Sequence, residues 1–353
     1  MSAIEFSPRQ TETERLTVHL IWMTSGLGCD GDTVAMTAAT RPSLEDLLTR
    51  ALPGMPGVAL YNPLLAVESG ADFMQAWYDA EAGKLDPFIL VLEGAVPNEE
   101  INGDGHWAAL GVDPGTGQPI TTNEWIDRLA PRAAIVLAVG TCATYGGIPA
   151  MRNNPTGAMG LRDYLGRDWR SRAGLPVVNL PGCPAQPDNI TETLLYLVLQ
   201  IAGTTQPIEL DEQGRPAWLF ERTAHEVCNR AGFADHGDYA DRLGDDGRCL
   251  VKFGCKGPVV KCNVPSRGWI NGVGGCPNVG GICIACTMPG FPDKYLPLMD
   301  SGLKSRMLAS TARFAYGPLL RHLRNQSMKR RYEVEPEWRR PGAELASGYR
   351  PRW

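Results

Sequence analysis

Ten cysteines dominate the chemistry open to this 353-residue sequence. Seven lie between residues 228 and 286, where Cys249-x5-Cys255 and Cys283-x2-Cys286 form tight pairs; His225 precedes Cys228 by three positions. Soft thiolates select zinc or iron–sulfur clusters. An even number of cysteines, gathered among Gly and Pro in a chain long enough for a real core, favours metal binding over disulfides or inert thiols.

Counting ligands divides the cysteines into three sites. A zinc site needs four ligands, often as two close pairs, and the spacing of most of these cysteines fits that pattern poorly. Iron–sulfur clusters therefore fit better, and a zinc-stabilised scaffold without electron transfer is the alternative. The sets are His225, Cys228, Cys249 and Cys255; Cys262, Cys276, Cys283 and Cys286; and Cys29, Cys142 and Cys183 with Asp30 or Asp32 as the fourth ligand.

The elements that must position the first cysteines alternate between strand and helix. Uninterrupted apolar runs at 17–23, 88–92, 134–139 and 176–180 are typical of strands buried on both faces. Helices are expected at 43–51, with Ser43 as N-cap, and at 188–202. This alternation predicts an α/β domain with a doubly wound parallel sheet.

Each predicted strand leads directly into a residue that could do chemistry. Cys29, Glu93, Cys142 and Cys183 follow the four strands in order. Open α/β sheets build their sites beyond the carboxyl ends of the strands, so these residues are expected to converge at one edge. The Gly and Pro around them let backbone amides approach a bulky ligand.

The chain changes character at about residue 206. A polar connector leads into a segment rich in Gly and Cys with few periodic elements, which metal clusters would have to hold together. Residues 301–353 carry 12 Lys or Arg and 4 Asp or Glu, a charge of +8, and are expected to be an interaction extension. We therefore expect domains at 1–205 and 206–300, followed by the extension at 301–353.

The overall composition excludes several classes of protein. With 43% hydrophobic and 21% charged residues the chain reads as a soluble globular protein, and a net charge of −5 gives no case for nucleic acid binding. The N-terminus shows no signal peptide, and the longest apolar segment, 194–202, is too short to span a membrane. A cytoplasmic location is expected, with peripheral association to a membrane left open.

Five motifs resemble, in order and spacing, those of the small subunits of nickel–iron hydrogenases. They are VGTCATYGG, NLPGCPAQPDNI, HEVCNR, GRCLVKFGCKGP and GICIACTMPGF, and the resemblance covers roughly residues 16–293. It implies a flavodoxin-like first domain holding a proximal cluster and a second domain holding a medial and a distal cluster. The proximal ligands would be Cys29, Cys142 and Cys183; the medial ones Cys262, Cys283 and Cys286; and the distal ones His225, Cys228, Cys249 and Cys255.

The sequence departs from the usual family pattern at two ligand positions. Gly26 stands where relatives have a first proximal cysteine, so Asp30 or Asp32 must supply an oxygen, or the proximal cluster is a 3Fe–4S form. Cys276 stands near the position of a proline in most relatives, and it predicts a 4Fe–4S medial cluster in place of 3Fe–4S. Glu93 matches a family glutamate near the proximal cluster, where a redox or proton-transfer role is expected; the alternative is a carboxylate that caps a loop.

The resemblance also implies partners. The nickel–iron centre that splits H2 would lie in a large subunit, in a heterodimer that assembles into a dimer of heterodimers or larger, and this chain would pass electrons to a quinone or another carrier. Gly26 at the first proximal position, together with the lack of a signal peptide, makes the sequence most similar to the small subunits of actinobacterial-type (group 5), high-affinity, oxygen-insensitive hydrogenases. The rival is an iron–sulfur subunit of a quinone-reductase-like complex, whose relatives lack the second, cysteine-rich domain.

Overall fold

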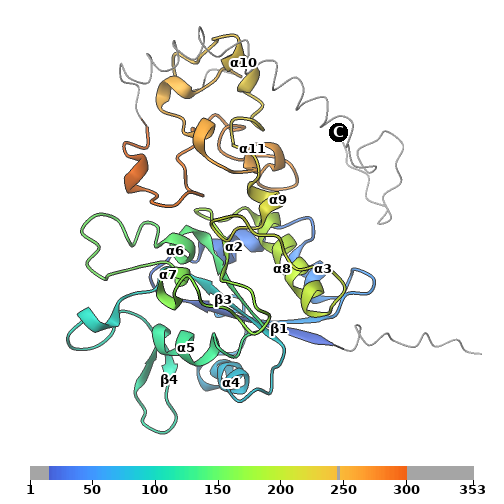
Figure 1. The fold of residues 1–353 in the computed structure, drawn as a ribbon, viewed down its shortest axis with the longest axis vertical. Helices are drawn as coiled ribbons and strands as arrows, with labels where there is room; N and C mark the ends of the chain where they lie inside the picture. Colours follow the sequence, from blue (N-terminus) through green and yellow to red (C-terminus); the bar gives the residue numbers. More distant parts are fainter. Residues whose placement is uncertain (1–15, 245–246, 300–353) are drawn as a thin grey trace, which may run out of the picture.

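A computed structural model describes residues 16–244 and 247–299. The first part is built on a five-stranded parallel sheet with the strand order β2-β1-β3-β6-β7 (Figure 1). The strands are β1 (Thr17–Thr24), β2 (Gly57–Tyr61), β3 (Phe88–Glu93), β6 (Ile135–Val139) and β7 (Val178–Leu180). The predicted α/β class with a parallel sheet is confirmed.

Helices cover both faces of this sheet because the strands are apolar at consecutive positions. On β3, Ile89 and Val91 pack into one core with α3 and α8, whereas Leu90 and Leu92 pack into a second core with α4 and α5. The helices of the first part are α2 (Gly31–Met36), α3 (Leu44–Leu48), α4 (Gly70–Glu81), α5 (Thr122–Leu129), α6 (Gly140–Tyr145), α7 (Leu161–Leu165) and α8 (Pro187–Ile201).

Most predicted elements of the first part are present. The four predicted strands correspond to β1, β3, β6 and β7, and the two predicted helices to α3 and α8. Ser43 caps α3 in a capping box with Asp46. The edge strand β2 and the antiparallel hairpin of β4 (Ala109–Val112) and β5 (Pro119–Thr121) were not predicted.

The second part has little regular structure, as expected. Its helices are the short α9 (Ala217–Phe220), α10 (Ala231–Asp235) and α11 (Val264–Arg267), with single turns of 3-10 helix between them. A small hydrophobic cluster in this part includes the buried Cys262 and Cys283. In Figure 1 this part lies against the edge of the sheet where α2 and α6 begin. No helix among the described residues is both long and apolar enough to cross a membrane.

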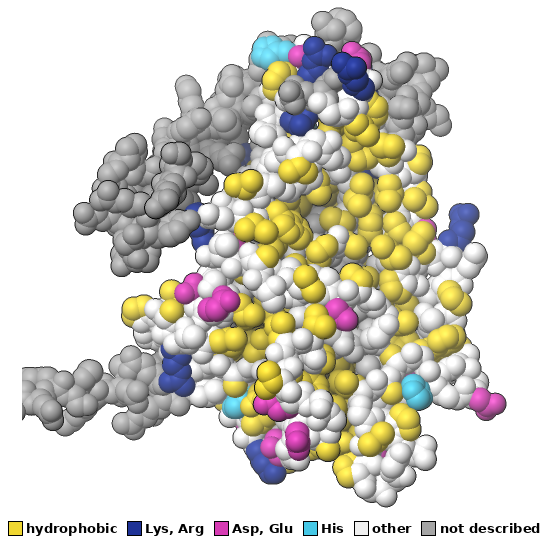
Figure 2. Space-filling model, turned by 180° about the vertical axis from the view of Figure 1, so that it is seen from behind, with side chains coloured by type: hydrophobic (Ala, Val, Ile, Leu, Met, Phe, Trp, Pro, Cys, Tyr) yellow, Lys and Arg dark blue, Asp and Glu magenta, His cyan; other side chains and the backbone are white. Residues whose placement is uncertain are grey.

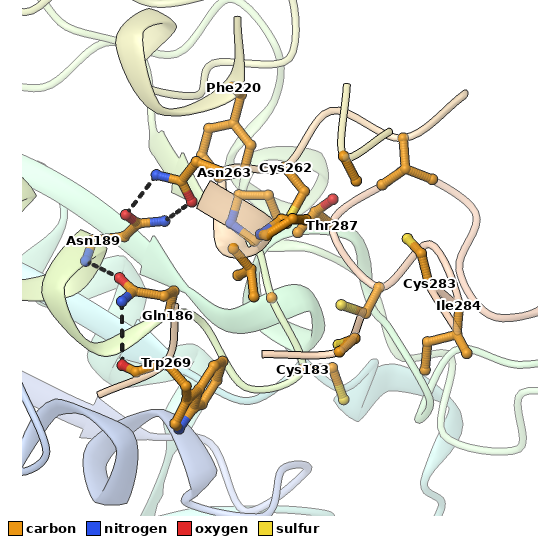
Figure 3. Close-up of a pocket in the computed structure, with 18 of the residues that line it drawn as sticks. Cys183, Gln186, Asn189, Phe220, Cys262, Asn263, Trp269, Cys283, Ile284 and Thr287 are labelled. Carbon is orange, nitrogen blue, oxygen red and sulfur yellow. Dashed lines mark hydrogen bonds between the residues drawn. The ribbon is translucent and has the colours of Figure 1, made fainter. Parts of the chain in front are cut away.

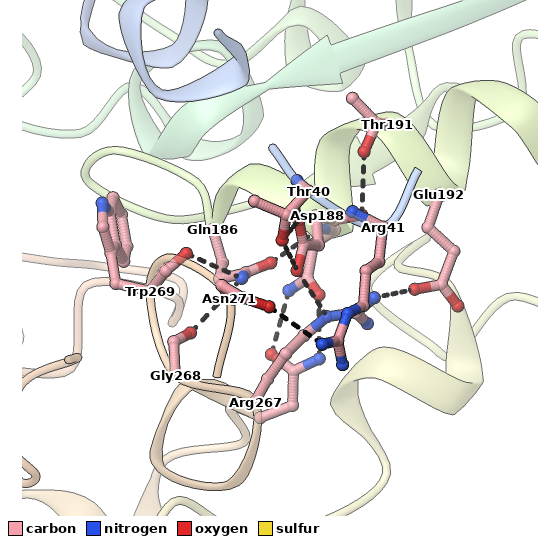
Figure 4. Close-up of polar contacts among 12 residues, drawn as sticks. Thr40, Arg41, Gln186, Asp188, Thr191, Glu192, Arg267, Gly268, Trp269 and Asn271 are labelled. Carbon is pink, nitrogen blue, oxygen red and sulfur yellow. Dashed lines mark hydrogen bonds and ion pairs between the residues drawn. The ribbon is translucent and has the colours of Figure 1, made fainter. Parts of the chain in front are cut away.

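Polar side chains from the start of α8 join the two parts. Asn189 and Asn263 exchange two amide hydrogen bonds of 2.9 Å, and Nε2 of Gln186 donates to the carbonyl oxygens of Gly268 and Trp269, each at 3.3 Å. Figure 4 shows the neighbouring contacts, in which the guanidinium of Arg267 binds Glu192 and that of Arg41 donates to Asn271 at 2.8 Å. The second part is thereby held on the helix that follows Cys183.

Candidate functional site

The carboxyl edge of the sheet brings the three N-terminal cysteines together. Cys29 precedes α2, Cys142 lies in the first turn of α6 after β6, and Cys183 follows β7. Burial raises the pKa of Cys142 to about 12, and the charges of Cys183, Asp32 and Cys29 add to this shift. Charges act on a pKa in this way only over short distances, so the three cysteines and Asp32 lie at one site, the proximal site. The thiols of Cys29 and Cys183 belong to exposed residues, so this site opens onto the surface of the chain.

Two buried carboxylates support the proximal site from the sheet side. Glu93, 2% exposed, accepts hydrogen bonds from Nε1 of Trp22 at 3.0 Å and from the backbone amides of Asp32 and Thr33 at 2.8 and 3.2 Å. Asp32 in turn accepts a 2.7 Å bond from the amide of Ala185. Burial, followed by the charge of Glu93, raises the pKa of Asp32 to about 7. Glu93 therefore caps the start of α2 and fixes the segment that carries Cys29.

The two candidate aspartates differ in what their carboxylates already bind. Asp32 is buried and tied to the loop after Cys183, through Ala185. Asp30 is half-buried with φ at 52°, and its carboxylate makes no hydrogen bond or ion pair with any described residue. Asp30 is therefore the aspartate with an uncommitted carboxylate beside Cys29.

Four cysteines of the second part meet around one pocket, the medial site. The pocket is lined by Cys262, Cys276, Cys283 and Cys286 together with Cys183 from the first part (Figure 3). Burial raises the pKa of Cys262 to about 12 and that of Cys286 well above its usual value, and the neighbouring medial cysteines raise both further. The set counted from the sequence thus comes together, Cys276 included.

The remaining ligand candidates gather at the far end of the second part, the distal site. Burial raises the pKa of Cys249 to about 11, with further contributions from the charges of Cys255 and Cys228. His225 lies in the same region, since its backbone amide donates to the carbonyl oxygen of Gly257, two residues after Cys255, at 3.0 Å. The four residues expected as the third set therefore lie in one region of the second part.

Arg230 is a residue of the distal site that the sequence did not single out. Its guanidinium, on a side chain that is almost fully buried, donates to the carbonyl oxygen of Pro277 at 2.7 Å and to that of Arg248 at 2.8 Å. Its charge lowers the pKa of Cys249 against the larger effect of burial. Arg230 belongs to the HEVCNR motif, but only the fold shows that it links the loop of Cys276 to that of Cys249.

The donor sets fit iron–sulfur clusters. All ten cysteines are described and none forms a disulfide. Buried thiols whose charges raise one another's pKa are poor thiolates on their own, and coordinated iron would stabilise the thiolate form. Within the described ranges no three His, Cys, Asp or Glu side chains stand close enough to hold a single metal ion.

Comparison with known proteins agrees with this arrangement. Residues 29–197 match the family "NADH ubiquinone oxidoreductase, 20 Kd subunit", and residues 220–299 match the C-terminal family of NiFe/NiFeSe hydrogenase small subunits. The chain is 31% identical over 284 residues to the periplasmic NiFeSe hydrogenase small subunit of Desulfomicrobium baculatum, a match covering 79% of this chain and 85% of that protein.

Solved structures give the same result. The actinobacterial-type NiFe-hydrogenase from Ralstonia eutropha H16 superimposes with a TM-score of 0.84 and 57% identity, over 98% of this chain and 100% of that chain. A reduced, active NiFeSe hydrogenase of Desulfomicrobium baculatum gives a TM-score of 0.70 and 30% identity over 79% of this chain and 98% of that chain.

A parallel sheet with cysteines at its carboxyl edge, followed by a cysteine-rich second part, defines an iron–sulfur subunit of a redox enzyme. The chain belongs to the small subunits of nickel–iron hydrogenases, the electron-transfer subunits of these enzymes, and its similarity to the actinobacterial type is confirmed. The quinone-reductase alternative is not favoured, because residues 220–299 match the hydrogenase-specific C-terminal family.

Proposed function

We propose that this chain conducts electrons released from H2 at the nickel–iron centre of a large subunit through a proximal, a medial and a distal cluster to an acceptor. When bound, each iron–sulfur cluster would take up and release one electron. The observation that carries the proposal is the series of contacts between the three cysteine sets: Thr141, beside Cys142, is hydrogen-bonded to Cys286, and the amide of Cys283 is hydrogen-bonded to Sγ of Cys255.

All three clusters are proposed to be of the 4Fe–4S type, each with four protein ligands. The proximal ligands are Cys29, Cys142, Cys183 and an aspartate; the medial ones are Cys262, Cys276, Cys283 and Cys286; the distal ones are His225, Cys228, Cys249 and Cys255. For the aspartate we favour Asp30, whose carboxylate is uncommitted, over Asp32, whose carboxylate holds the Ala185 amide. A carboxylate is a harder ligand than a thiolate and would alter the potential of the proximal cluster.

The fourth medial thiolate can be tested directly. Replacing Cys276 with Ala removes one iron ligand, and the expected result is an oxidised 3Fe–4S EPR signal that the unaltered protein lacks. Val279→Ala, an exposed neighbour three residues away, is the matched control and should leave the spectrum unchanged. A 3Fe–4S medial signal already present in the unaltered protein would contradict the assignment of Cys276.

Glu93 is proposed to stabilise one redox state of the proximal cluster or to relay protons near it. In support, its carboxylate lies at the carboxyl end of β3 and is hydrogen-bonded to the backbone of α2, two residues from the Cys29–Asp30 turn. The variant Glu93→Gln keeps the shape of the side chain while removing its charge. Unchanged turnover and an unchanged proximal EPR signal in this variant would leave Glu93 as a structural cap of α2.

The small subunits of this family pair with a large hydrogenase subunit. Figure 2 shows a face of this chain on which hydrophobic side chains gather over the cysteine-rich half. Exposed apolar area of this kind is typical of a surface that a partner covers. We propose that the open proximal site is covered by the large subunit, and that heterodimers pair further.

The remaining assignments follow from the sequence. We propose the divisions 1–205, 206–300 and 301–353, the last a basic interaction extension outside the described residues. A quinone or another carrier is proposed as acceptor. A cytoplasmic location, with peripheral association to a membrane, stays a prediction; the relative from Desulfomicrobium baculatum is named periplasmic.

The first test is to purify the chain with whatever binds it, count iron and labile sulfide, and record EPR spectra of oxidised and reduced samples. About twelve irons, as three four-iron clusters require, no large oxidised 3Fe–4S signal and a co-purifying nickel protein are expected. Folded protein with zinc and without iron would overturn the proposal.

A further inference from the structure

The hydroxyl of Thr141 lies where the loops of two cluster sites meet. Thr141 precedes Cys142 in α6 and is 1% exposed. Its Oγ1 accepts a 3.0 Å hydrogen bond from the amide of Gly182, the residue before Cys183, and donates to the carbonyl oxygen of Cys286. One hydroxyl thus connects the segments of two proximal ligands to the backbone of a medial ligand, across 145 residues of sequence.

A further hydrogen bond fixes this junction. The amide of Thr141 donates to the carbonyl oxygen of Gly182 at 2.7 Å, which locks the two proximal loops together. The backbone amide of Cys183 lies close enough to the thiol of Cys286 to oppose, weakly, the larger effect of burial, which raises the pKa of that thiol. The hydroxyl of Thr141 therefore joins the medial ligand loop to two proximal ligand loops that are already bonded to each other.

The other end of the same medial loop contacts the distal site in the same way. The amide of Cys283 donates to Sγ of Cys255 at 3.3 Å, and the amide of Lys256 donates to the carbonyl oxygen of Cys283 at 2.8 Å. The Cys283–Cys286 loop is thus hydrogen-bonded to ligand segments on both sides. Bonds and hydrogen bonds run unbroken from Cys142 through Thr141, Cys286 and Cys283 to Cys255.

We propose that Thr141 is a positioning residue for electron transfer, whose hydroxyl supplies the hydrogen-bonded route between the proximal and medial ligands and holds these ligands at a fixed separation. This inference rests on the proposed cluster relay. Electron tunnelling through bonds and hydrogen bonds is faster than across a gap of the same length, because the electronic coupling decays more steeply through empty space. In a buried, water-excluded junction no solvent can replace a lost hydrogen bond.

Thr144 offers a matched comparison within the same helix. It is also 1% exposed, but its hydroxyl donates only to the carbonyl oxygen of Thr141 at 3.3 Å and reaches no medial residue. A Thr→Val change at either position removes one buried hydroxyl from α6 and keeps the side-chain volume. Only the change at Thr141 interrupts the connection to Cys286.

The test uses the intact hydrogenase carrying Thr141→Val, Thr141→Ala, Thr141→Ser or Thr144→Val. Iron and sulfide counts establish cluster loading, and H2/D2O isotope exchange reports the nickel–iron centre without using the relay. EPR of the reduced enzyme reports magnetic coupling between the proximal and medial clusters. Freeze-quench EPR after mixing with H2 gives the rate at which the medial cluster is reduced.

The expected result is full loading and unchanged isotope exchange, with weaker magnetic coupling and several-fold slower medial reduction in Thr141→Val and Thr141→Ala. Thr141→Ser and Thr144→Val should match the unaltered enzyme. Unchanged coupling and rate in a loaded Val or Ala variant would overturn the role of Thr141 while leaving the relay intact. Failure of both variants to load clusters, with Thr144→Val loaded, would overturn it as well, because Thr141 would then serve assembly. Unaltered enzyme without clusters would instead refute the proposed relay.

Discussion

The pair of amides between Asn189 and Asn263 allows a quantitative test of how the two parts are joined. Asn189 lies in the first turn of α8 and is 4% exposed, and Asn263 directly follows Cys262. Each side chain donates one hydrogen bond of 2.9 Å to the other. Replacing either residue with Ala removes both bonds and strands the amide of the partner in a half-buried interface.

The magnitude follows from the number of groups that lose their partner. A net hydrogen bond is worth about 1 kcal/mol, and a buried polar group left unpaired costs about 1–3 kcal/mol. Each single variant should therefore weaken the junction by about 2–3 kcal/mol. The double variant leaves no stranded amide and should cost less than the sum of the single ones, with a coupling energy of about 1–2 kcal/mol.

Native-state hydrogen exchange of the assembled enzyme measures this free energy locally, on peptides that cover 262–269 and 186–192. Since about 1.4 kcal/mol corresponds to a tenfold change, each single variant should speed exchange there by roughly 30- to 150-fold. Peptides from β3 and β6 serve as internal controls and should not change. Strictly additive effects, or single variants that cost under about 0.5 kcal/mol, would refute the view that this amide pair holds the second part on α8.

Two further predictions concern the first part. A Cβ added at Gly140, where φ is +83°, would stand 1.9 Å from Oδ2 of Asp32. Gly140→Ala should therefore displace Asp32 and lower the iron loading of the proximal site. The control is Gly166→Ala, where φ is +94° and nothing lies within 4 Å, and this variant should cost only the backbone strain of about 1–2 kcal/mol. Equal losses in the two variants, by iron analysis and thermal unfolding, would contradict the clash. Burial lowers the pKa of His19 from 6.5, so its contribution to stability is present above that value and is lost as pH falls through the lowered pKa. His19→Gln should therefore reduce the loss of thermal stability between about pH 7.5 and about pH 5.5, and an unchanged pH dependence would contradict this.

The strands that were predicted are wholly or largely buried. All residues of β3 and β6 are buried, so their sequences are continuous apolar runs that periodicity alone identifies. The edge strand β2 is half-buried over its last three residues and is followed by Asn62 and Pro63. Such a sequence pattern is typical of a loop. The other edge strand, β7, is buried at all three residues and was predicted, so partial exposure, and not edge position alone, explains why β2 escaped prediction.

Ligand candidates were recognisable from residue type and motif spacing, whereas their supports were not. Thr141 contacts Cys286 across 145 residues and Asn189 contacts Asn263 across 74, and neither pair carries a local pattern. The choice between Asp30 and Asp32 likewise depends on whether Ala185 reaches the carboxylate, which only the folded chain decides. Local sequence can specify which atoms bind iron, but long-range packing determines which polar groups remain free to do so.

In the second part, cysteines that are candidate ligands also belong to the hydrophobic core. Its small hydrophobic cluster is built around Cys262 and Cys283, with Ala224, Val260 and Ala285 beside them. Five residues of this size bury little apolar area, so the cluster cannot offset the entropy of ordering the Gly-rich loops around it. We therefore expect coordination by iron and the contacts with α8 to supply the difference, so that folding of this part is coupled to metal binding. The residues that conduct electrons are, on this argument, the same residues that give this part its structure.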